Sequence, residues 1–88
     1  MHGHRTEPPA PGSPAHQAQR DVLLELVVDP PAAGDPVREL PARLGHDADL
    51  IAAAIAELAA VGLVTRRADA VFATAAALRF EALGLVRA

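Results

Sequence analysis

The pattern of hydrophobic and polar positions over residues 45–67 predicts a helix, a turn and a strand, in that order. The segment reads GHDADLIAAAIAELAAVGLVTRR. Its apolar residues recur with the spacing of one helix face, at Leu50, Ile51, Ala54, Ile55 and Leu58. Asp47 is placed to cap the start of this helix and Gly62 to close its end. Residues 63–65 then change to the β-branched composition that is typical of a strand.

An earlier hydrophobic stretch predicts a first helix from residue 15 or 16 to residue 28. The main apolar stripe of this helix consists of Val22, Leu23, Leu26 and Val27. A second apolar edge is formed by Leu24 and Val28. On a helical wheel the apolar arc is about 240°, wider than packing on one side requires. The helix ends before Pro30, because the residue that precedes a proline disfavours helical geometry. We therefore expect this helix to lie at the centre of the core or to contact a second chain.

Asp35 and Pro36 predict the start of a second helix that runs to Leu44. The Asp35 carboxylate is a capping acceptor, and Pro36 suits a first turn, in which a free N–H is not needed. Leu40 and Leu44 are one helical turn apart and are expected to face the core. Pro41 lies beyond the expected first turn, so the helix either begins late or bends there.

The last third of the chain predicts a hairpin and a final helix. Residues 63–67 and 70–73 have the composition of two short strands, joined by Ala68 and Asp69. Thr74 is a plausible cap for the helix that follows. The apolar side chains of that helix are Leu78, Phe80, Ala82 and Leu83.

The first fifteen residues differ in composition from the rest of the chain. They include four prolines and, after Met1, no apolar side chain larger than Ala apart from proline itself. Burial cannot offset the entropy lost on ordering such a segment. We expect residues 1–15 to form a disordered tail and residues 16–88 to form one domain.

Composition and charge narrow the class of protein. The absence of cysteine excludes disulfides and thiolate zinc sites. The formal net charge is −3, whereas a free nucleic-acid-binding protein usually carries a basic surface. No apolar run is long enough for a membrane span, and the N-terminal residues lack the apolar core of a signal peptide. We therefore expect a cytoplasmic protein that does not contact a membrane.

Few residues offer catalytic chemistry. The chain has no Tyr, Trp or Lys, and Ser13 falls in the expected tail. Neither His16 nor His46 has a nucleophile or a paired carboxylate beside it in the sequence. The group His46, Asp47 and Asp49 has two interpretations, a metal site or a turn with a helix cap, and the cap is favoured. We expect no enzymatic activity, no cofactor and no metal site.

The order of elements resembles that of a known family. The segment ELPARLG, the periodic helix and the following GLV are similar to the pattern of winged helix-turn-helix regulators, such as the small bacterial MarR and ArsR types. The resemblance covers about residues 22–83. It implies a mainly α fold with a small β-hairpin: a three-helix core, a two-stranded wing and a C-terminal helix. Pro41 departs from the family, in which a small residue, usually Ala, follows the Glu-Leu pair.

The resemblance also implies that the protein is a transcriptional regulator that binds double-stranded DNA. In the family the second helix of the pair reads the major groove, a role that would fall to residues 47–61. The candidate DNA contacts are Arg38, Arg43, Ala48, Ala52, Arg66 and Arg67. Residues 47–61 contain no Arg or Lys, so no bidentate arginine–guanine contact can form there. A winged-helix module that binds a protein partner instead of DNA therefore remains the alternative.

The surplus of apolar residues on the first and last helices predicts a homodimer. The expected interface residues are Leu24, Val28, Phe80 and Leu83, with Leu85 and Val86 as additional apolar surface. In the resembled families, helices outside the helix-turn-helix commonly form the dimer interface. The alternative is that these side chains fold back on a single core.

Overall fold

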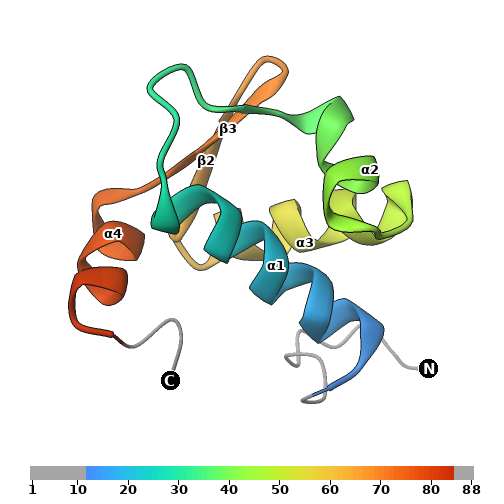
Figure 1. Ribbon diagram of the computed structural model, residues 1–88, viewed down its shortest axis with the longest axis horizontal. Coiled ribbons are helices and arrows are strands. Elements are labelled where there is room, and N and C mark those ends of the chain that lie inside the picture. Colours follow the sequence, from blue (N-terminus) through green and yellow to red (C-terminus); the bar gives the residue numbers. More distant parts are fainter. Residues whose placement is uncertain (1–11, 85–88) are drawn as a thin grey trace.

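The computed structural model describes residues 12–84 as a mainly helical fold with a small antiparallel sheet (Figure 1). The helices are α1 (Pro14–Val28), α2 (Leu40–Leu44), α3 (Ala48–Ala60) and α4 (Ala75–Ala82), with a 3-10 helix η1 (Val37–Glu39). The strands are β1 (Asp35–Pro36), β2 (Val64–Arg67) and β3 (Ala70–Ala73), in the order β1-β3-β2. The mainly helical class and the hairpin are confirmed. Residues 1–11 of the expected tail, together with Leu85 and Val86, lie outside the described residues.

Helix α1 begins slightly earlier than the sequence pattern predicts. Ser13 is its N-cap, and the Ser13 hydroxyl oxygen accepts a hydrogen bond from the His16 amide at 3.2 Å. Pro14 follows in the first turn, where its missing N–H leaves no bond unmade. Residues 13–15, which the prediction assigned to the tail, therefore start the helix. The end at Val28, before Asp29 and Pro30, is confirmed.

The core lies where α1 packs against α3, with β2, β3 and α2 closing its sides (Figure 1). Its buried residues are Ala18, Val22, Leu26, Leu40, Ile51, Ala54, Ile55, Leu58, Val64 and Val71. The predicted apolar face of α3 is confirmed, with Leu50 only partly buried. Ala18 extends the buried stripe of α1 by one turn beyond the predicted stripe. It escaped prediction because a single Ala carries little hydrophobic signal.

The prediction that Asp35 and Pro36 start a helix is wrong. These two residues form β1, in which Asp35 lies opposite Val71 and Pro36 opposite Ala70 on β3. Proline is tolerated there because β1 is an edge strand, whose outward side needs no N–H donor. The chain then makes the 3-10 turn η1, and α2 starts only at Leu40 with Pro41 in its first turn. Of the two alternatives for the proline, a late helix start is therefore correct.

Two capping residues join the C-terminal elements to α3. Gly62 follows α3 with φ +84°, in the left-handed region that favours glycine. The Thr74 hydroxyl donates to the Gly62 carbonyl at 2.7 Å and accepts from the Ala77 amide at 3.3 Å. The predicted roles of both residues are confirmed. One side chain thus caps α4 and fixes it to the turn that leads from α3 into the hairpin.

Gly34 allows the loop before β1 to pass close to the ring of Phe72. Its φ is +78°, and a Cβ added there would lie 2.8 Å from the Phe72 Cζ atom. The guanidinium of Arg67 lies over the same ring, 5.2 Å from its centroid. Moving the ring to admit a Cβ would disturb this contact as well.

We expect Gly34→Ala to lower the free energy of unfolding by about 2–3 kcal/mol, from left-handed strain and overpacking together. Gly45→Ala is the matched control, because Gly45 has φ +73° but nothing within 4 Å of the added Cβ. That control should lose only about 1 kcal/mol, from the strain alone. Urea unfolding of both variants measures the difference. If both variants lost the same unfolding free energy, the close approach of residue 34 to Phe72 would contribute nothing to the cost.

Candidate functional site

Two arginines lie on the hairpin, on opposite faces of β2. Arg66 pairs with Val71 and Arg67 with Ala70, and neighbouring strand residues project to opposite sides. The Arg66 Nε donates to the Ala68 carbonyl at 3.1 Å, which holds that side chain against the hairpin turn. Both arginines are exposed. As predicted, only one of them faces any given side of the hairpin.

The fold brings Arg38 to the same end of the sheet. β1 pairs with β3, and the Val37 amide at the start of η1 donates to the Asp69 carbonyl in the hairpin turn at 2.7 Å. Arg38 is exposed and, within residues 12–84, takes part in no ion pair. Arg38, Arg66 and Arg67 therefore form an exposed cationic group around the hairpin turn, which we call the hairpin arginine group.

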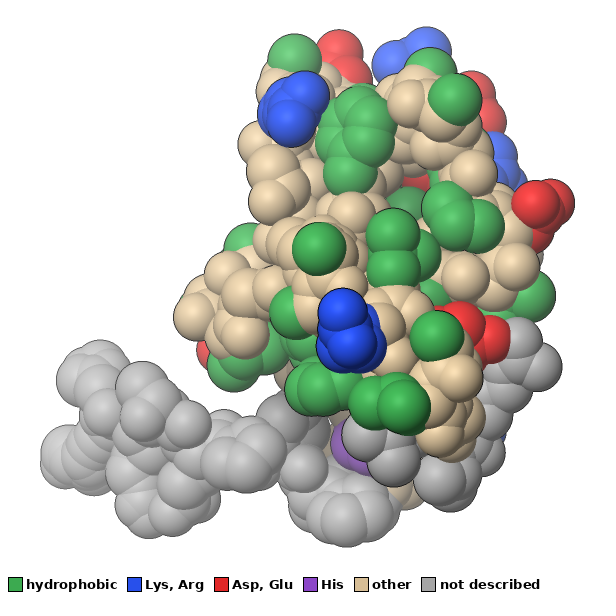
Figure 2. Space-filling view, turned by 90° about the vertical axis from the view of Figure 1, so that its left-hand side faces the viewer, with side chains coloured by type: hydrophobic (Ala, Val, Ile, Leu, Met, Phe, Trp, Pro, Cys, Tyr) green, Lys and Arg blue, Asp and Glu red, His purple; other side chains and the backbone are tan. Residues whose placement is uncertain are grey.

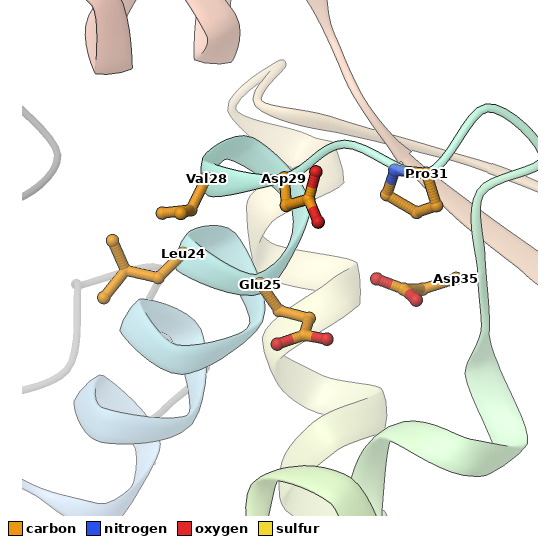
Figure 3. Close-up of a pocket in the computed structure, with 6 residues that line it drawn as sticks. All are labelled: Leu24, Glu25, Val28, Asp29, Pro31 and Asp35. Atoms are coloured by element: carbon orange, nitrogen blue, oxygen red, sulfur yellow. The ribbon is translucent and has the colours of Figure 1, made fainter.

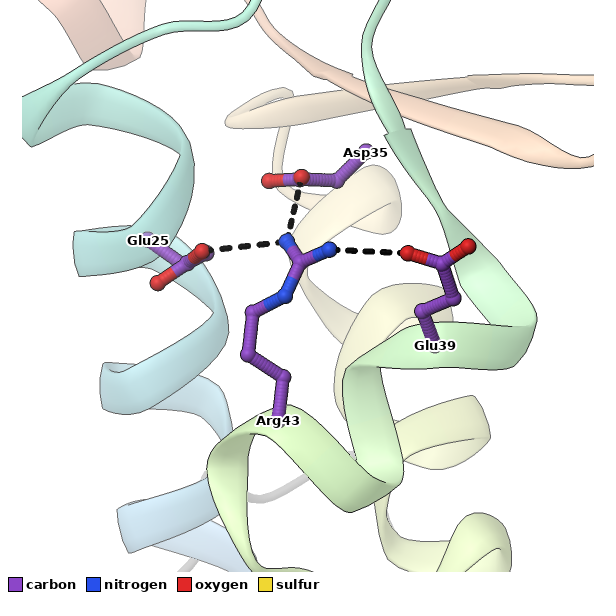
Figure 4. A network of polar contacts seen from close by, with 4 residues as sticks. All are labelled: Glu25, Asp35, Glu39 and Arg43. Carbon is purple, nitrogen blue, oxygen red and sulfur yellow. Dashed lines mark hydrogen bonds and ion pairs between the residues drawn. The ribbon is translucent and has the colours of Figure 1, made fainter.

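Arg43 is placed differently, at the centre of a network of carboxylates (Figure 4). Its Nη1 lies 3.1 Å from Glu25 Oε2 on α1 and 2.6 Å from Asp35 Oδ1 on β1. Its Nη2 lies 2.9 Å from Glu39 Oε1 on η1. The hydrogen bond to Asp35 and then the one to Glu25 raise the pKa of the Arg43 guanidinium. A phosphate would have to compete with these carboxylates, so the geometry favours a structural role for Arg43 over the predicted DNA contact.

The exposed face of α3 carries the other predicted contacts. Ala48 and Ala52 are both exposed there. The capping interpretation of Asp47 is confirmed, because its carboxylate accepts from the Asp49 amide at 2.9 Å. His46 turns away from this cap, and its Nε2 lies 2.7 Å from Asp21 Oδ2 on α1. The face therefore combines small methyl groups with carboxylates near its N-terminus.

The predicted dimer residues divide into two groups. Helices α1 and α4 pack against each other, and large apolar side chains stay exposed on both: Val28 of α1, and Phe80 and Leu83 at the end of α4. Figure 2, which views the molecule from the α4 side, shows hydrophobic side chains gathered on this face. We call this set the α1–α4 apolar patch. Leu24 is half-buried and lines a groove beside α1, and Val28 borders both this groove and the patch.

That groove is a cavity of about 410 Å³ between the end of α1, the following loop and β1 (Figure 3). Its lining is Leu24, Glu25, Val28, Asp29, Pro31 and Asp35. Neither the cavity nor the carboxylate network was predicted from the sequence. One local signal was present: Glu39 and Arg43 are four residues apart, the spacing of a helical ion pair. The contribution of Asp35 left no such signal, because β1 forms only through pairing with a distant strand.

No protein-family model matches the chain, and no curated protein is significantly similar to it in sequence. The helices of residues 12–84 lack the combined length and hydrophobicity that crossing a membrane requires. Function must therefore be argued from the geometry of the chain itself.

Proposed function

We propose that the protein is a small winged-helix protein that binds double-stranded DNA and acts as a transcriptional regulator. In this assignment α2 and α3 are the helix-turn-helix, and β2 with β3 is the wing. Three residues, Gly45 to Asp47, separate the two helices, and Gly45 has φ +73°. A turn of three or four residues that often contains Gly is typical of this motif. The hairpin follows α3 directly, as the assignment requires.

The observation that carries the proposal is the hairpin arginine group. Three exposed guanidinium groups from η1 and β2 lie around one turn, although the chain as a whole has a net charge of −3. Arginine makes the phosphate contacts that position a protein on DNA without reading its sequence. On α3, the methyl groups of Ala48 and Ala52 can contact thymine methyl groups, and the acidic Asp49 weakens the approach to phosphate. We therefore expect weak, salt-sensitive binding with little sequence preference.

Replacing Arg66 and Arg67 together by Ala tests this binding. The double variant should bind all duplex sequences more weakly and should reduce the slope of log K against log salt by about 1, since only one of the two arginines faces a given side of the hairpin and each phosphate contact contributes about 0.9. Fluorescence anisotropy with two unrelated duplexes at several salt concentrations measures both effects. The matched control is Arg20→Ala with Arg79→Ala, which removes the same charge from exposed positions on α1 and α4.

Two outcomes of this experiment count against DNA binding at the hairpin. If the control variant weakens binding as much as the hairpin variant, the effect comes from net charge alone. If the unmodified protein binds no duplex even at low salt, the alternative function is favoured. That alternative is a protein-interaction module, supported by the exposed alanines of α3 (Ala52, Ala53 and Ala56), whose small side chains allow a partner helix to approach closely.

We further propose that the protein is a symmetric homodimer joined through the α1–α4 apolar patch. Val28 is 53% exposed, Phe80 42% and Leu83 64%. A two-fold interface uses the same patch on both subunits, so one self-complementary apolar surface is sufficient. A dimer would also place two hairpin arginine groups on one assembly, which suits binding to two half-sites of a duplex.

A further inference from the structure

The cavity beside the end of α1 has an apolar wall and an acidic wall (Figure 3). Leu24 and Val28 of α1 and Pro31 of the loop supply apolar carbon, while Glu25, Asp29 and Asp35 supply carboxylates. Its volume of about 410 Å³ is within the usual range for small-molecule sites. The lining combines hydrophobic surface with a few polar groups, as such sites commonly do.

Asp35 is the unusual member of this lining. It is 6% exposed and is the buried charged residue within the described part of the chain. Its Oδ1 is bonded to Arg43, but its Oδ2 is buried and has no hydrogen-bond partner among residues 12–84. Figure 4 shows this second oxygen pointing from β1 toward α1. A buried carboxylate oxygen without a donor is costly in free energy, and most buried polar atoms have a partner.

The charge balance around the cavity favours a cation. Three carboxylates line it, and the neighbouring guanidinium of Arg43 is shared by Glu25, Asp35 and also Glu39. The local charge therefore stays negative after Arg43 is counted. Among the described residues no group of three or more His, Cys, Asp or Glu is arranged to hold a metal ion. An organic cation with an aliphatic body matches both walls better than a hydrated metal ion does.

We propose that this cavity binds a small primary alkylammonium compound. The ammonium group donates hydrogen bonds to Asp35 Oδ2 and to the carboxylate of Glu25 or Asp29, and the alkyl chain packs against Leu24 and Val28. Oδ2 is shielded from solvent, so the ligand reaches it only when the side chains around it move aside. The site is separate from the hairpin arginine group, and the proposal does not depend on DNA binding.

Titration of the 15N-labelled protein with n-butylammonium chloride at constant ionic strength tests the proposal. Two probes of similar size serve as controls: 1-butanol, which lacks the charge, and sodium butyrate, which reverses it. We expect saturable amide shifts over residues 24–29 and at Asp35 with the amine alone. Shifts of the same size with 1-butanol would identify a merely apolar groove and overturn the proposal, as would amine shifts that stay linear or are spread over the whole surface.

Variants locate the binding. Asp35→Asn keeps the size of the side chain and removes its charge, and should weaken amine binding at least about tenfold, through loss of a charge-assisted hydrogen bond. Asp29→Asn, at an exposed position outside the Arg43 network, should weaken it several-fold while leaving that network intact. Asp49→Asn on α3 makes the same change in net charge away from the cavity and should have no effect. If neither cavity variant binds more weakly than Asp49→Asn, the site is not the cavity.

Discussion

The Leu26→Ala variant is expected to lose about 3–4 kcal/mol of unfolding free energy. Leu26 is 1% exposed and lies in the core formed by α1, α3 and the sheet. Removing its side chain takes away buried apolar surface and leaves a cavity that the close-packed neighbours fill only in part. A chain of 88 residues has a total stability of only about 4–13 kcal/mol. The loss expected for Leu26→Ala is thus a large part of the total unfolding free energy.

Thermal unfolding followed by circular dichroism measures this effect. At a shift of roughly 4–8 °C for each kcal/mol in a small domain, the melting temperature should fall by more than about 12 °C. Val61→Ala is the control, because Val61 is 66% exposed after the end of α3; it should change stability by no more than about 0.5 kcal/mol. A loss at Leu26 as small as at Val61 would mean that α1 does not pack on the core as described.

The contrast between α3 and β1 shows which parts of the fold could be read from the sequence. The face, the cap and the end of α3 all follow from residues within one or two turns of each other, so Ile51, Asp47 and Gly62 were assigned correctly. β1 exists because residues 35 and 36 pair with residues 70 and 71. Nothing near Asp35 records that pairing, and an aspartate before a proline is a strong local signal for a helix start. The local signal for a helix start was present, but pairing with β3 determined the structure of these two residues.

The candidate sites follow the same division. The alternation of Arg66 and Arg67 and the exposure of Phe80 and Leu83 are consequences of local periodicity, and the prediction anticipated them. The binding partners of Arg43 are not local, since Glu25 is 18 residues away and Asp35 is 8 residues away. From the sequence Arg43 was one of several free arginines. Only the packing of β1 beside α1 shows that its two Nη atoms are already bonded to carboxylates.

The double variant Phe80→Glu with Leu83→Glu is expected to be a folded monomer, whereas the unmodified protein should be a dimer at micromolar concentration. α4 is fixed to the core through Ala77, which is 0% exposed, and through its cap at Thr74. Phe80 is 42% exposed and Leu83 is 64% exposed, so both leave much of their surface open to solvent. A glutamate at either position remains solvated in the monomer, but in a dimer it would be buried without a partner, which is strongly unfavourable.

Sedimentation velocity gives the oligomeric state, and circular dichroism checks that the variant keeps its helices. Val61→Glu is the matched control, because it places the same charge on another exposed apolar residue outside the α1–α4 apolar patch. That control should remain a dimer, since a symmetric interface is broken only by changes within the shared patch. A clean monomer for the unmodified protein would end the dimer proposal, and an unfolded double variant would place Phe80 and Leu83 in the core. If Val61→Glu dissociates the dimer and the double variant does not, the subunits meet instead at the end of α3.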